Sequence, residues 1–191
     1  MKLASKIFQK DNWYVTSPFG YREVIETKAG LTSSSHNGCD YGTYGQKWNQ
    51  YAIENGKIID CGMDSDGANY ILVSYPRINI KLLHYHLDKV MVCKGQSVHG
   101  GSLLGTTGST GKATGIHLHL GLLDKNNNYI DPHKYEYNDE IKKRIYTVKI
   151  GDNLSSIVKR YNTSWEKIYQ ENKEVIGDDP NLILPGQKLI I

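Results

Sequence analysis

Gly115-Ile116-His117-Leu118-His119-Leu120-Gly121 is the stretch that decides the fold of this chain. Successive side chains of a β-strand point to opposite faces, so His117 and His119 would lie together on one face. The apolar residues Ile116, Leu118 and Leu120 would face the other way, into the core. The stretch therefore predicts a half-buried strand whose polar face is free for chemistry. Taken alone, it fits equally well a strand with two partly exposed histidines.

Two further segments carry histidines in a similar setting. In His36-Asn37-Gly38-Cys39-Asp40, the histidine and the aspartate are four residues apart and share a face if the chain is extended. Leu82-Leu83-His84-Tyr85-His86-Leu87 contains a second His-x-His on an apolar run of strand character. Five of the seven histidines therefore fall in three short segments.

This set of side chains suits a hydrolytic zinc site. Such sites use three nitrogen or oxygen ligands from the protein and keep a fourth position for water. His36, Asp40 and His119 would supply that set. His117 and His86 would lie nearby without binding the metal, where one can accept a proton from the attacking water and the other can stabilise an oxyanion. We expect His117 to be the base and His86 the oxyanion partner, although the sequence does not fix this order.

The three segments resemble the motifs of the lysostaphin-type zinc endopeptidases, which cut cross-bridges and stem peptides of peptidoglycan. In that family the first histidine, the aspartate and the last histidine bind zinc, which implies His36, Asp40 and His119. The catalytic histidines of the family correspond to His86 and His117. The resemblance spans roughly residues 13 to 135. His84 departs from it, because the family more usually carries tyrosine there, and His84 is a competing candidate ligand.

The fold class follows from short β runs separated by glycine between Trp13 and Pro132. Their close spacing predicts a mainly β, antiparallel-sheet domain over residues 1–133, without a long helix between Trp13 and Pro132. In the segment Phe19-Gly20-Tyr21-Arg22, we expect a structural turn whose Arg22 pairs with a carboxylate. The expected strands are 51–53, 56–59, 70–75, 80–83, 102–105 and the strand that contains His117.

A charged stretch, residues 134–145, is expected to link this domain to a second module over residues 146–191. The module reads as strand, helix, helix, strand, a small α+β unit, with Asp152 expected to cap its first helix. It resembles a LysM module, which binds glycans that contain N-acetylglucosamine. The resemblance implies a glycan site formed by two loops, with Gly151, Asp152, Asn153, Leu154, Asn181, Leu182 and Ile183 as its residues.

Charge and composition limit the classes of binding partner that we expect. The chain has a formal net charge of +3, and residues 146–191 carry six positive and six negative side chains. Neither value predicts a nucleic-acid partner. Apolar runs are too short to cross a bilayer, so we expect no membrane partner. The expected partner is bacterial peptidoglycan, with its peptide as substrate and its glycan as ligand; the sequence does not predict an oligomeric state.

The cellular setting is a further expectation. Lys2, Lys6 and Lys10 interrupt the apolar residues at the start, so no signal peptide is expected there. Cys39, Cys61 and Cys93 are expected to be buried thiols, as suits synthesis in a reducing cytoplasm. The protein would then act on the wall after release, like a phage endolysin, or as part of a particle. The alternatives are a catalytically silent wall-binding scaffold, which would lack ligands, and a structural component of a virion.

Overall fold

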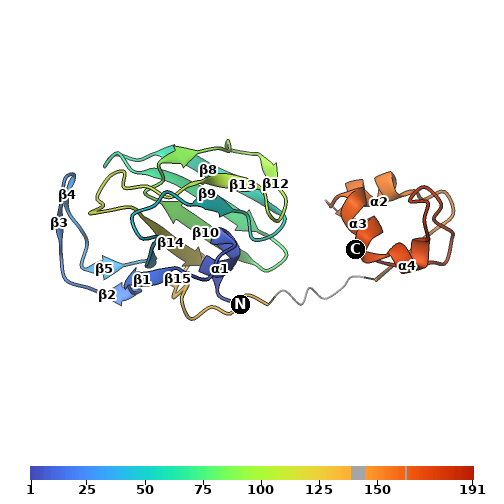
Figure 1. Cartoon of the computed structure of the whole chain (residues 1–191), viewed down its shortest axis with the longest axis horizontal. Helices are drawn as coiled ribbons and strands as arrows, with labels where there is room; N and C mark the ends of the chain where they lie inside the picture. The colour runs from blue at the N-terminus through green and yellow to red at the C-terminus, as the bar shows by residue number, and fades with distance from the viewer. Residues whose placement is uncertain (139–144, 162) are drawn as a thin grey trace. The chain divides into compact units, whose positions relative to one another are not determined.

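A computed structural model of the chain describes residues 1–138, 145–161 and 163–191. The chain forms two compact units, Met1–Tyr137 and Asn138–Ile191 (Figure 1). The first unit extends beyond the boundary expected at residue 133, because Tyr137 is buried and its hydroxyl lies 3.4 Å from the Ile53 carbonyl oxygen. Of the expected linker, residues 139–144 lie outside the described residues.

The first unit is built on an eight-stranded antiparallel sheet, as the sequence predicted. Its strands follow the order β1-β6-β14-β10-β9-β8-β12, and β15 pairs with β14. The glycine-separated β runs supply its long central strands. The bounds are β1 Tyr14–Ser17, β6 Cys39–Gly42, β8 Gly56–Met63, β9 Asn69–Tyr75, β10 Ile80–Tyr85, β12 Ser97–Val98, β14 His117–Leu123 and β15 Tyr129–Ile130.

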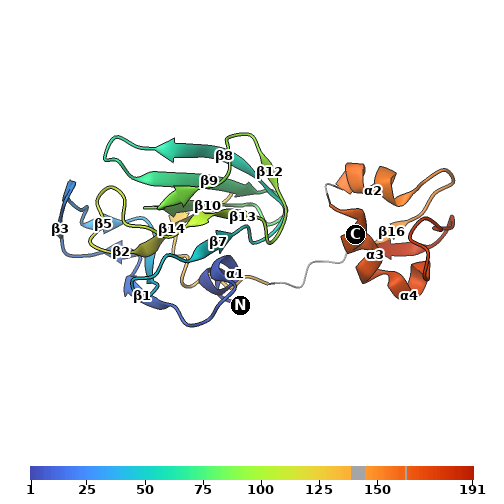
Figure 2. The ribbon, with the colours of Figure 1, turned by 45° about the horizontal axis from the view of Figure 1, so that its top comes forward.

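Shorter pairings complete this unit. A three-stranded sheet has the order β11-β13-β7, and two small hairpin-like pairs, β2-β5 and β3-β4, lie near the start of the chain. Figure 2 shows the short sheet beside the large one. The bounds are β2 Gly20–Tyr21, β3 Glu26–Thr27, β4 Gly30–Leu31, β5 Ser35–His36, β7 Asn49–Tyr51, β11 Lys89–Val90 and β13 Leu103–Thr106.

Strand β14 divides its side chains between core and site as predicted. Leu118, Leu120 and Leu122 are fully buried in the apolar cluster. His117 and His119 alternate with them and so project from the opposite face. Ile116 differs from the prediction, because it precedes the strand and lines a groove instead of the core.

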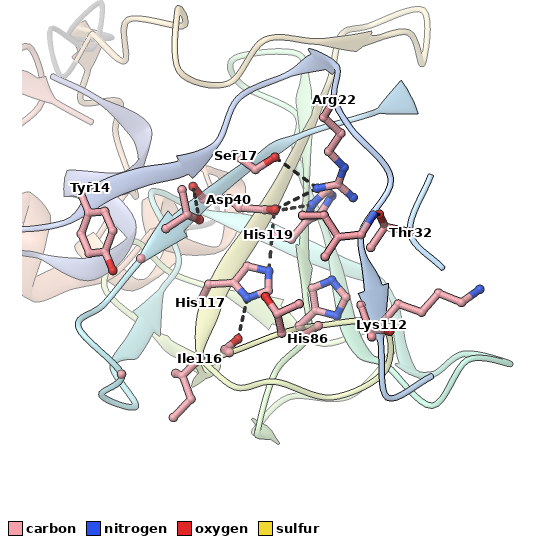
Figure 3. Close-up of a pocket in the computed structure, with 18 residues that line it drawn as sticks. Tyr14, Ser17, Arg22, Thr32, Asp40, His86, Lys112, Ile116, His117 and His119 are labelled. Carbon is pink, nitrogen blue, oxygen red and sulfur yellow. Dashed lines mark hydrogen bonds and ion pairs between the residues drawn. The ribbon is translucent and has the colours of Figure 1, made fainter. Parts of the chain in front are cut away.

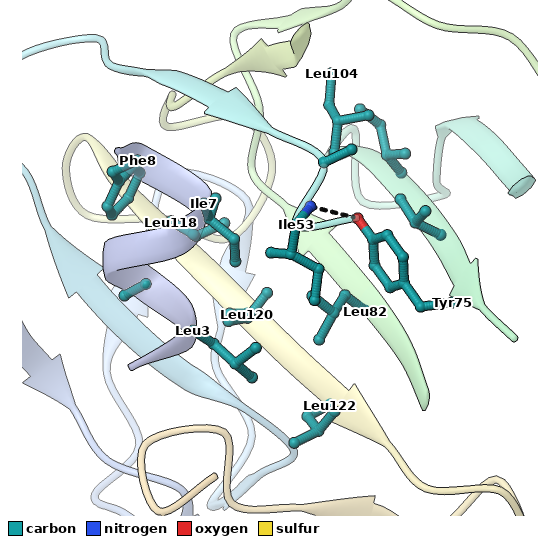
Figure 4. Packing of buried hydrophobic residues seen from close by; sticks show 14 of the residues in the cluster. Leu3, Ile7, Phe8, Ile53, Tyr75, Leu82, Leu104, Leu118, Leu120 and Leu122 are labelled. Carbon is teal, nitrogen blue, oxygen red and sulfur yellow. Dashed lines mark hydrogen bonds between the residues drawn. The ribbon is translucent and has the colours of Figure 1, made fainter. Parts of the chain in front are cut away.

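A short helix that the sequence did not predict also packs on this core. It is α1, Leu3–Phe8, and its apolar residues Leu3, Ile7 and Phe8 are buried. The helix packs against β7, and Figure 4 shows Leu3 and Ile7 directed toward leucines of β14. Residues 3–8 are therefore part of the folded unit.

The second unit has the predicted strand-helix-helix-strand order. It consists of β16 Ile145–Thr147, α2 Leu154–Tyr161, α3 Trp165–Glu171 and β17 Lys188–Ile190, with an additional turn of helix, α4 Lys173–Ile176. Asn153 caps α2 in place of the expected Asp152, since its Oδ1 accepts a 2.8 Å hydrogen bond from the Ser156 amide. None of the helices described is long and apolar enough to span a membrane.

The cysteines only partly match their prediction. All three are free thiols. Cys39 is buried and Cys61 half-buried, but Cys93 is exposed, because it lies in the loop between β11 and β12.

Candidate metal centre

Two neighbouring strands bring Asp40 and His119 together. These residues lie directly opposite each other in the antiparallel pairing of β6 and β14, so their side chains share one face of the sheet. His36 ends β5, just before the turn that leads into β6, and its side chain is buried beside them. Residues 79 to 83 positions apart in the sequence thus meet at one point. Figure 3 shows two of them, Asp40 and His119.

Three potential metal-ligand atoms lie close together at this point. His36 Nε2 lies 3.1 Å from Asp40 Oδ1 and 2.9 Å from His119 Nδ1, and the last two atoms are 2.9 Å apart. His36 Nδ1 lies 2.7 Å from the Pro18 carbonyl oxygen. Because a carbonyl oxygen only accepts, Nδ1 must carry the proton of a neutral His36, and Nε2 points a lone pair at the other two atoms.

This arrangement fits zinc. Ligand atoms in a tetrahedral zinc site, with bonds of about 2.0–2.1 Å, lie about 3.3 Å apart, within a few tenths of the separations here. Two imidazole nitrogens and a carboxylate oxygen are a typical set of zinc ligands. A bound cation would offset the repulsion between their lone pairs, which point toward one another. His36, Asp40 and His119 are the three ligands that the sequence predicted, and among the described residues they form the one cluster able to hold a metal.

Asp40 is held as a carboxylate. Burial by itself would raise its pKa, but the close approach of His119 and His36 to Oδ1 outweighs burial and keeps the pKa well below its ordinary value. Arg22 Nη1 lies 3.1 Å from Oδ2, the oxygen that does not face the histidines. The carboxylate expected to pair with Arg22 is therefore that of a metal ligand, and the pairing leaves Oδ1 for the ion.

Gly38 makes room for His119. A Cβ atom at Gly38 would lie 2.5 Å from the Leu120 carbonyl oxygen and 2.8 Å from two atoms of the His119 ring. Real Cβ atoms essentially never approach other atoms within 3.0 Å. The glycine between His36 and Asp40 is thus required by the closeness of β14, not by an unusual backbone angle.

His117 and His86 face the same site without joining the cluster. His117 Nδ1 lies 2.8 Å from the Gly115 carbonyl oxygen, and His86 Nδ1 lies 2.7 Å from the Thr110 carbonyl oxygen. Each neutral ring therefore carries its proton on Nδ1 and leaves Nε2 as an acceptor. The ring centroids are 5.0 Å apart. Burial, followed by the nearby His117, lowers the pKa of His86 to about 4.

A change of backbone direction separates His86 from His84. Strand β10 ends at Tyr85, and His86 has a left-handed φ of 62°. The turn carries His86 to the site, whereas His84 stays in the core, with Nδ1 2.7 Å from Gln50 Oε1. The expectation that His84 competes for the metal is therefore wrong.

One known protein family matches the segment that carries this site. The sequence profile described as peptidase family M23 matches residues 34–132, which include all five histidine and aspartate positions described above. The chain belongs to peptidase family M23. The LysM domain profile matches residues 146–191. Both expected modules are thereby confirmed.

Similar proteins agree with this assignment. The peptidoglycan DD-endopeptidase ShyB of Vibrio cholerae is 36% identical over 92 residues, 48% of this chain and 21% of that protein. A zinc-containing peptidase from Vibrio cholerae has a TM-score of 0.55 and 28% identity, covering 68% of this chain and 39% of that one. The catalytic domain of lysostaphin from Staphylococcus simulans has a TM-score of 0.53 and 27% identity, and the match covers 63% of this chain and 90% of that domain. The chain spans about a fifth to a quarter of the length of the two peptidoglycan DD-endopeptidases of Vibrio cholerae that it matches, ShyB and ShyA.

The M23 unit has a groove of about 330 Å³ over the metal ligands. Its walls come from β1, from the segment that contains β3, and from residues 112–116. Figure 3 shows Tyr14 at one end and Lys112 at the other, with His117 and His86 between them. The glycine-rich run Gly105–Gly111 ends directly before the wall formed by residues 112–116.

Tyr85 is a site residue that the sequence reasoning missed. Its ring makes edge contacts with His86 and His119, with centroids 4.9 and 5.9 Å away, and its hydroxyl donates to Asp64 Oδ2. Tyr85 lies between two histidines in the sequence, so a period of two would have placed it on their opposite face. Tyr85 does lie opposite His84, but the left-handed turn at His86 brings the His86 ring to the side of Tyr85.

The predicted glycan residues of the LysM unit divide into two kinds. Leu154 and Ile183 are buried in its core, so their side chains pack inward. Leu182 is exposed, and Asp152 accepts hydrogen bonds from the Tyr146 hydroxyl and the Lys149 amide. Gly151 has a φ of 85°, a left-handed conformation that favours glycine. Asn181 is exposed, and its amide groups bond to Asp179.

Proposed function

We propose that the protein is a zinc-dependent peptidoglycan endopeptidase that cuts a peptide bond in cross-bridges or stem peptides. One observation carries the proposal: Asp40 and His119, with His36 buried behind them, line the same groove as two histidines whose Nε2 atoms are free. The family membership supports peptide hydrolysis, and the activity of the relative ShyB, a peptidoglycan DD-endopeptidase, supports the substrate.

His36, Asp40 and His119 would hold the ion. Bound zinc would polarise the scissile carbonyl and lower the pKa of a coordinated water. His117 accepts the proton at Nε2, because its Nδ1–H is fixed on the Gly115 carbonyl. Its Nε2 lies 3.7 Å from Asp40 Oδ1, so the accepting atom is next to the metal ligands. The same proton can then pass to the leaving amine.

His86 has a different role from His117 in the proposed reaction. With Nδ1–H bound to the Thr110 carbonyl, its neutral ring accepts at Nε2 and donates nothing into the groove. The expected oxyanion role would need a second proton on the ring, which the low pKa disfavours. We therefore assign His86 to orienting the attacking water by accepting its second hydrogen bond.

The LysM unit would bind wall glycan and so raise the local concentration of peptide substrate. We further propose an endolysin-like setting, with synthesis in a reducing cytoplasm and action after release. Three free thiols, one of them exposed, support such a compartment. Incorporation of the protein in a particle is the alternative, and its detection in purified virions would favour that setting.

The test is digestion of purified walls followed by mass spectrometry of the fragments. New amino and carboxyl termini within the peptide are expected with the zinc-loaded protein. Chelation and His117→Ala should each abolish them, and added zinc should restore activity only after chelation. Release of reducing sugars without new peptide termini would refute the endopeptidase assignment, and wall binding without any cleavage would favour the silent scaffold.

A further inference from the structure

Two exposed tyrosines form an aromatic shelf at one end of the groove. The shelf consists of Tyr14 on β1 and Tyr44 in the turn after β6, whose ring centroids are 4.9 Å apart with a 49° tilt. They are 43% and 62% exposed, so much of both rings is left open to solvent. Tyr14 lines the groove directly, as does Gly45, the neighbour of Tyr44.

The turn that carries Tyr44 holds an uncommon conformation. Tyr44 and Gly45 both have left-handed φ angles, 54° and 70°, within a turn closed by the Gln46 amide on the Thr43 carbonyl oxygen at 3.0 Å. A bulky aromatic residue rarely adopts this conformation. Such strain concentrates at binding and catalytic sites, where the position of a side chain is functionally important.

Gly42 lies between the shelf and His117. Tyr14 and His117 are the residues opposite Gly42 on its two neighbouring strands, so all three lie in one row across the sheet and share a face. A Cβ at Gly42 would lie 2.5 Å from Cζ of the Tyr14 ring. The glycine lets the ring lie over β6, and no side chain stands between the shelf and His117.

The charges of the groove lie elsewhere. Among the described lining residues, the cationic side chains are Arg22, paired with Asp40, and Lys112, whose Nζ lies 2.9 Å from Asp66 Oδ2. Figure 3 shows Lys112 at the end opposite Tyr14. The shelf itself offers ring faces and hydroxyl groups beside Thr16. The shelf therefore suits a neutral, amphipathic ligand with a flat C–H face. A pyranose ring has these properties, whereas a charged peptide group does not.

We propose that the shelf binds an N-acetylated sugar ring of the substrate, so that the M23 unit itself recognises the glycan to which the peptide is attached. This inference rests on the proposed function, because it assumes a peptidoglycan substrate. It places a sugar subsite in the catalytic unit, separate from the LysM unit. Tyr14 and Tyr44 would determine specificity by stacking against the sugar, without taking part in proton transfer.

The test compares two substrates with the full chain. One is a cross-linked peptide dimer that retains its disaccharides, and the other is the same dimer after the sugars have been removed. We expect Tyr14→Ala and Tyr44→Ala each to lower the ratio of kcat/KM for the sugar-bearing to the sugar-free dimer by about 10-fold, an effect typical of one lost aromatic contact. Tyr14→Phe should keep the ratio. Tyr129→Ala, at a partly exposed tyrosine that does not line the groove, is the matched control.

Zinc content and melting temperature show that each variant is folded. An unchanged ratio in both alanine variants would overturn the proposal, and equal losses on the two substrates would assign the shelf to the peptide instead. If the wild-type protein cleaved neither dimer, the proposed function would fail. The shelf would still be judged by backbone amide NMR with N-acetylglucosaminyl-N-acetylmuramic acid: shifts at Gly42 and Tyr44 support it, and shifts confined to residues 146–191 refute it.

Discussion

Replacing Gly38 by alanine should weaken zinc binding without any change to a ligand. Ordinary Cβ contacts begin at 3.4 Å, so the new methyl would be too close to the Leu120 carbonyl oxygen by 0.9 Å (3.4 minus 2.5) and to the His119 ring by 0.6 Å (3.4 minus 2.8). Metal–ligand distances tolerate about 0.2 Å. Either β14 or the imidazole must therefore move by more than the zinc site allows.

The expected magnitude follows from that displacement. We expect zinc affinity to fall at least 10-fold, and kcat/KM at saturating zinc to fall on the order of 100-fold, as for other misplacements of nearly 1 Å. Overpacking should also cost about 1–3 kcal/mol of the free energy of unfolding. Competition with a chromophoric chelator measures the affinity, and thermal unfolding measures the stability.

Gly56→Ala is the matched control for this prediction. Its Cβ would lie 2.6 Å from the Ser74 carbonyl oxygen, a clash of the same size in the same unit, but among strands β8 and β9 and away from the ligands. It should lower the melting temperature similarly and keep its zinc affinity. Equal zinc affinities in the two variants would show that the space above Gly38 is not what positions His119.

Three further outcomes can be measured. Arg22→Ala should weaken zinc binding by roughly 10- to 100-fold in a competition titration, because Asp40 loses the partner of its second oxygen; unchanged affinity would remove Arg22 from the site. Burial lowers the pKa of His84 to about 3, so its stabilising effect is complete above pH 6.5 and is lost as the pH falls toward 3. His84→Gln should therefore make the free energy of unfolding less dependent on pH by about 1.4 kcal/mol per unit in this range, and denaturant titrations with parallel pH profiles would contradict this. Deleting residues 138–191 should slow the clearing of intact walls much more than the hydrolysis of a soluble peptide, measured by turbidity and chromatography; equal effects would make the LysM unit part of the peptidase itself.

Side-chain periodicity made much of the site predictable. Leu118 and Leu120 alternate with His117 and His119, and this local pattern persisted because β14 is regular over its whole length. The motif spacing and its family resemblance then identified His36 and Asp40 as partners. The antiparallel class likewise followed from short β runs and glycines.

Other features depend on backbone geometry or tertiary packing. The turn at His86 moves that residue off the face of His84 and to the side of Tyr85, and a single φ angle of this kind has no signature in a histidine-rich apolar run. Helix α1 was missed because six residues are too few for a clear period, although Leu3 and Ile7 are spaced by four. The sequence predicted that Arg22 would pair with a carboxylate. It did not identify Asp40 as that partner, because the pairing depends on β1 lying beside β6 in the folded chain.

The two ends of the M23 unit are joined to each other. The Met1 amino group lies 3.1 Å from the Tyr137 carbonyl oxygen, the Tyr137 amide donates to the Met1 carbonyl at 2.8 Å, and Lys2 pairs with Glu136. A tether attached to either end would therefore leave the catalytic body from the same place. A wall-binding module placed before Met1 or after Tyr137 would then have the same anchoring point on the M23 unit.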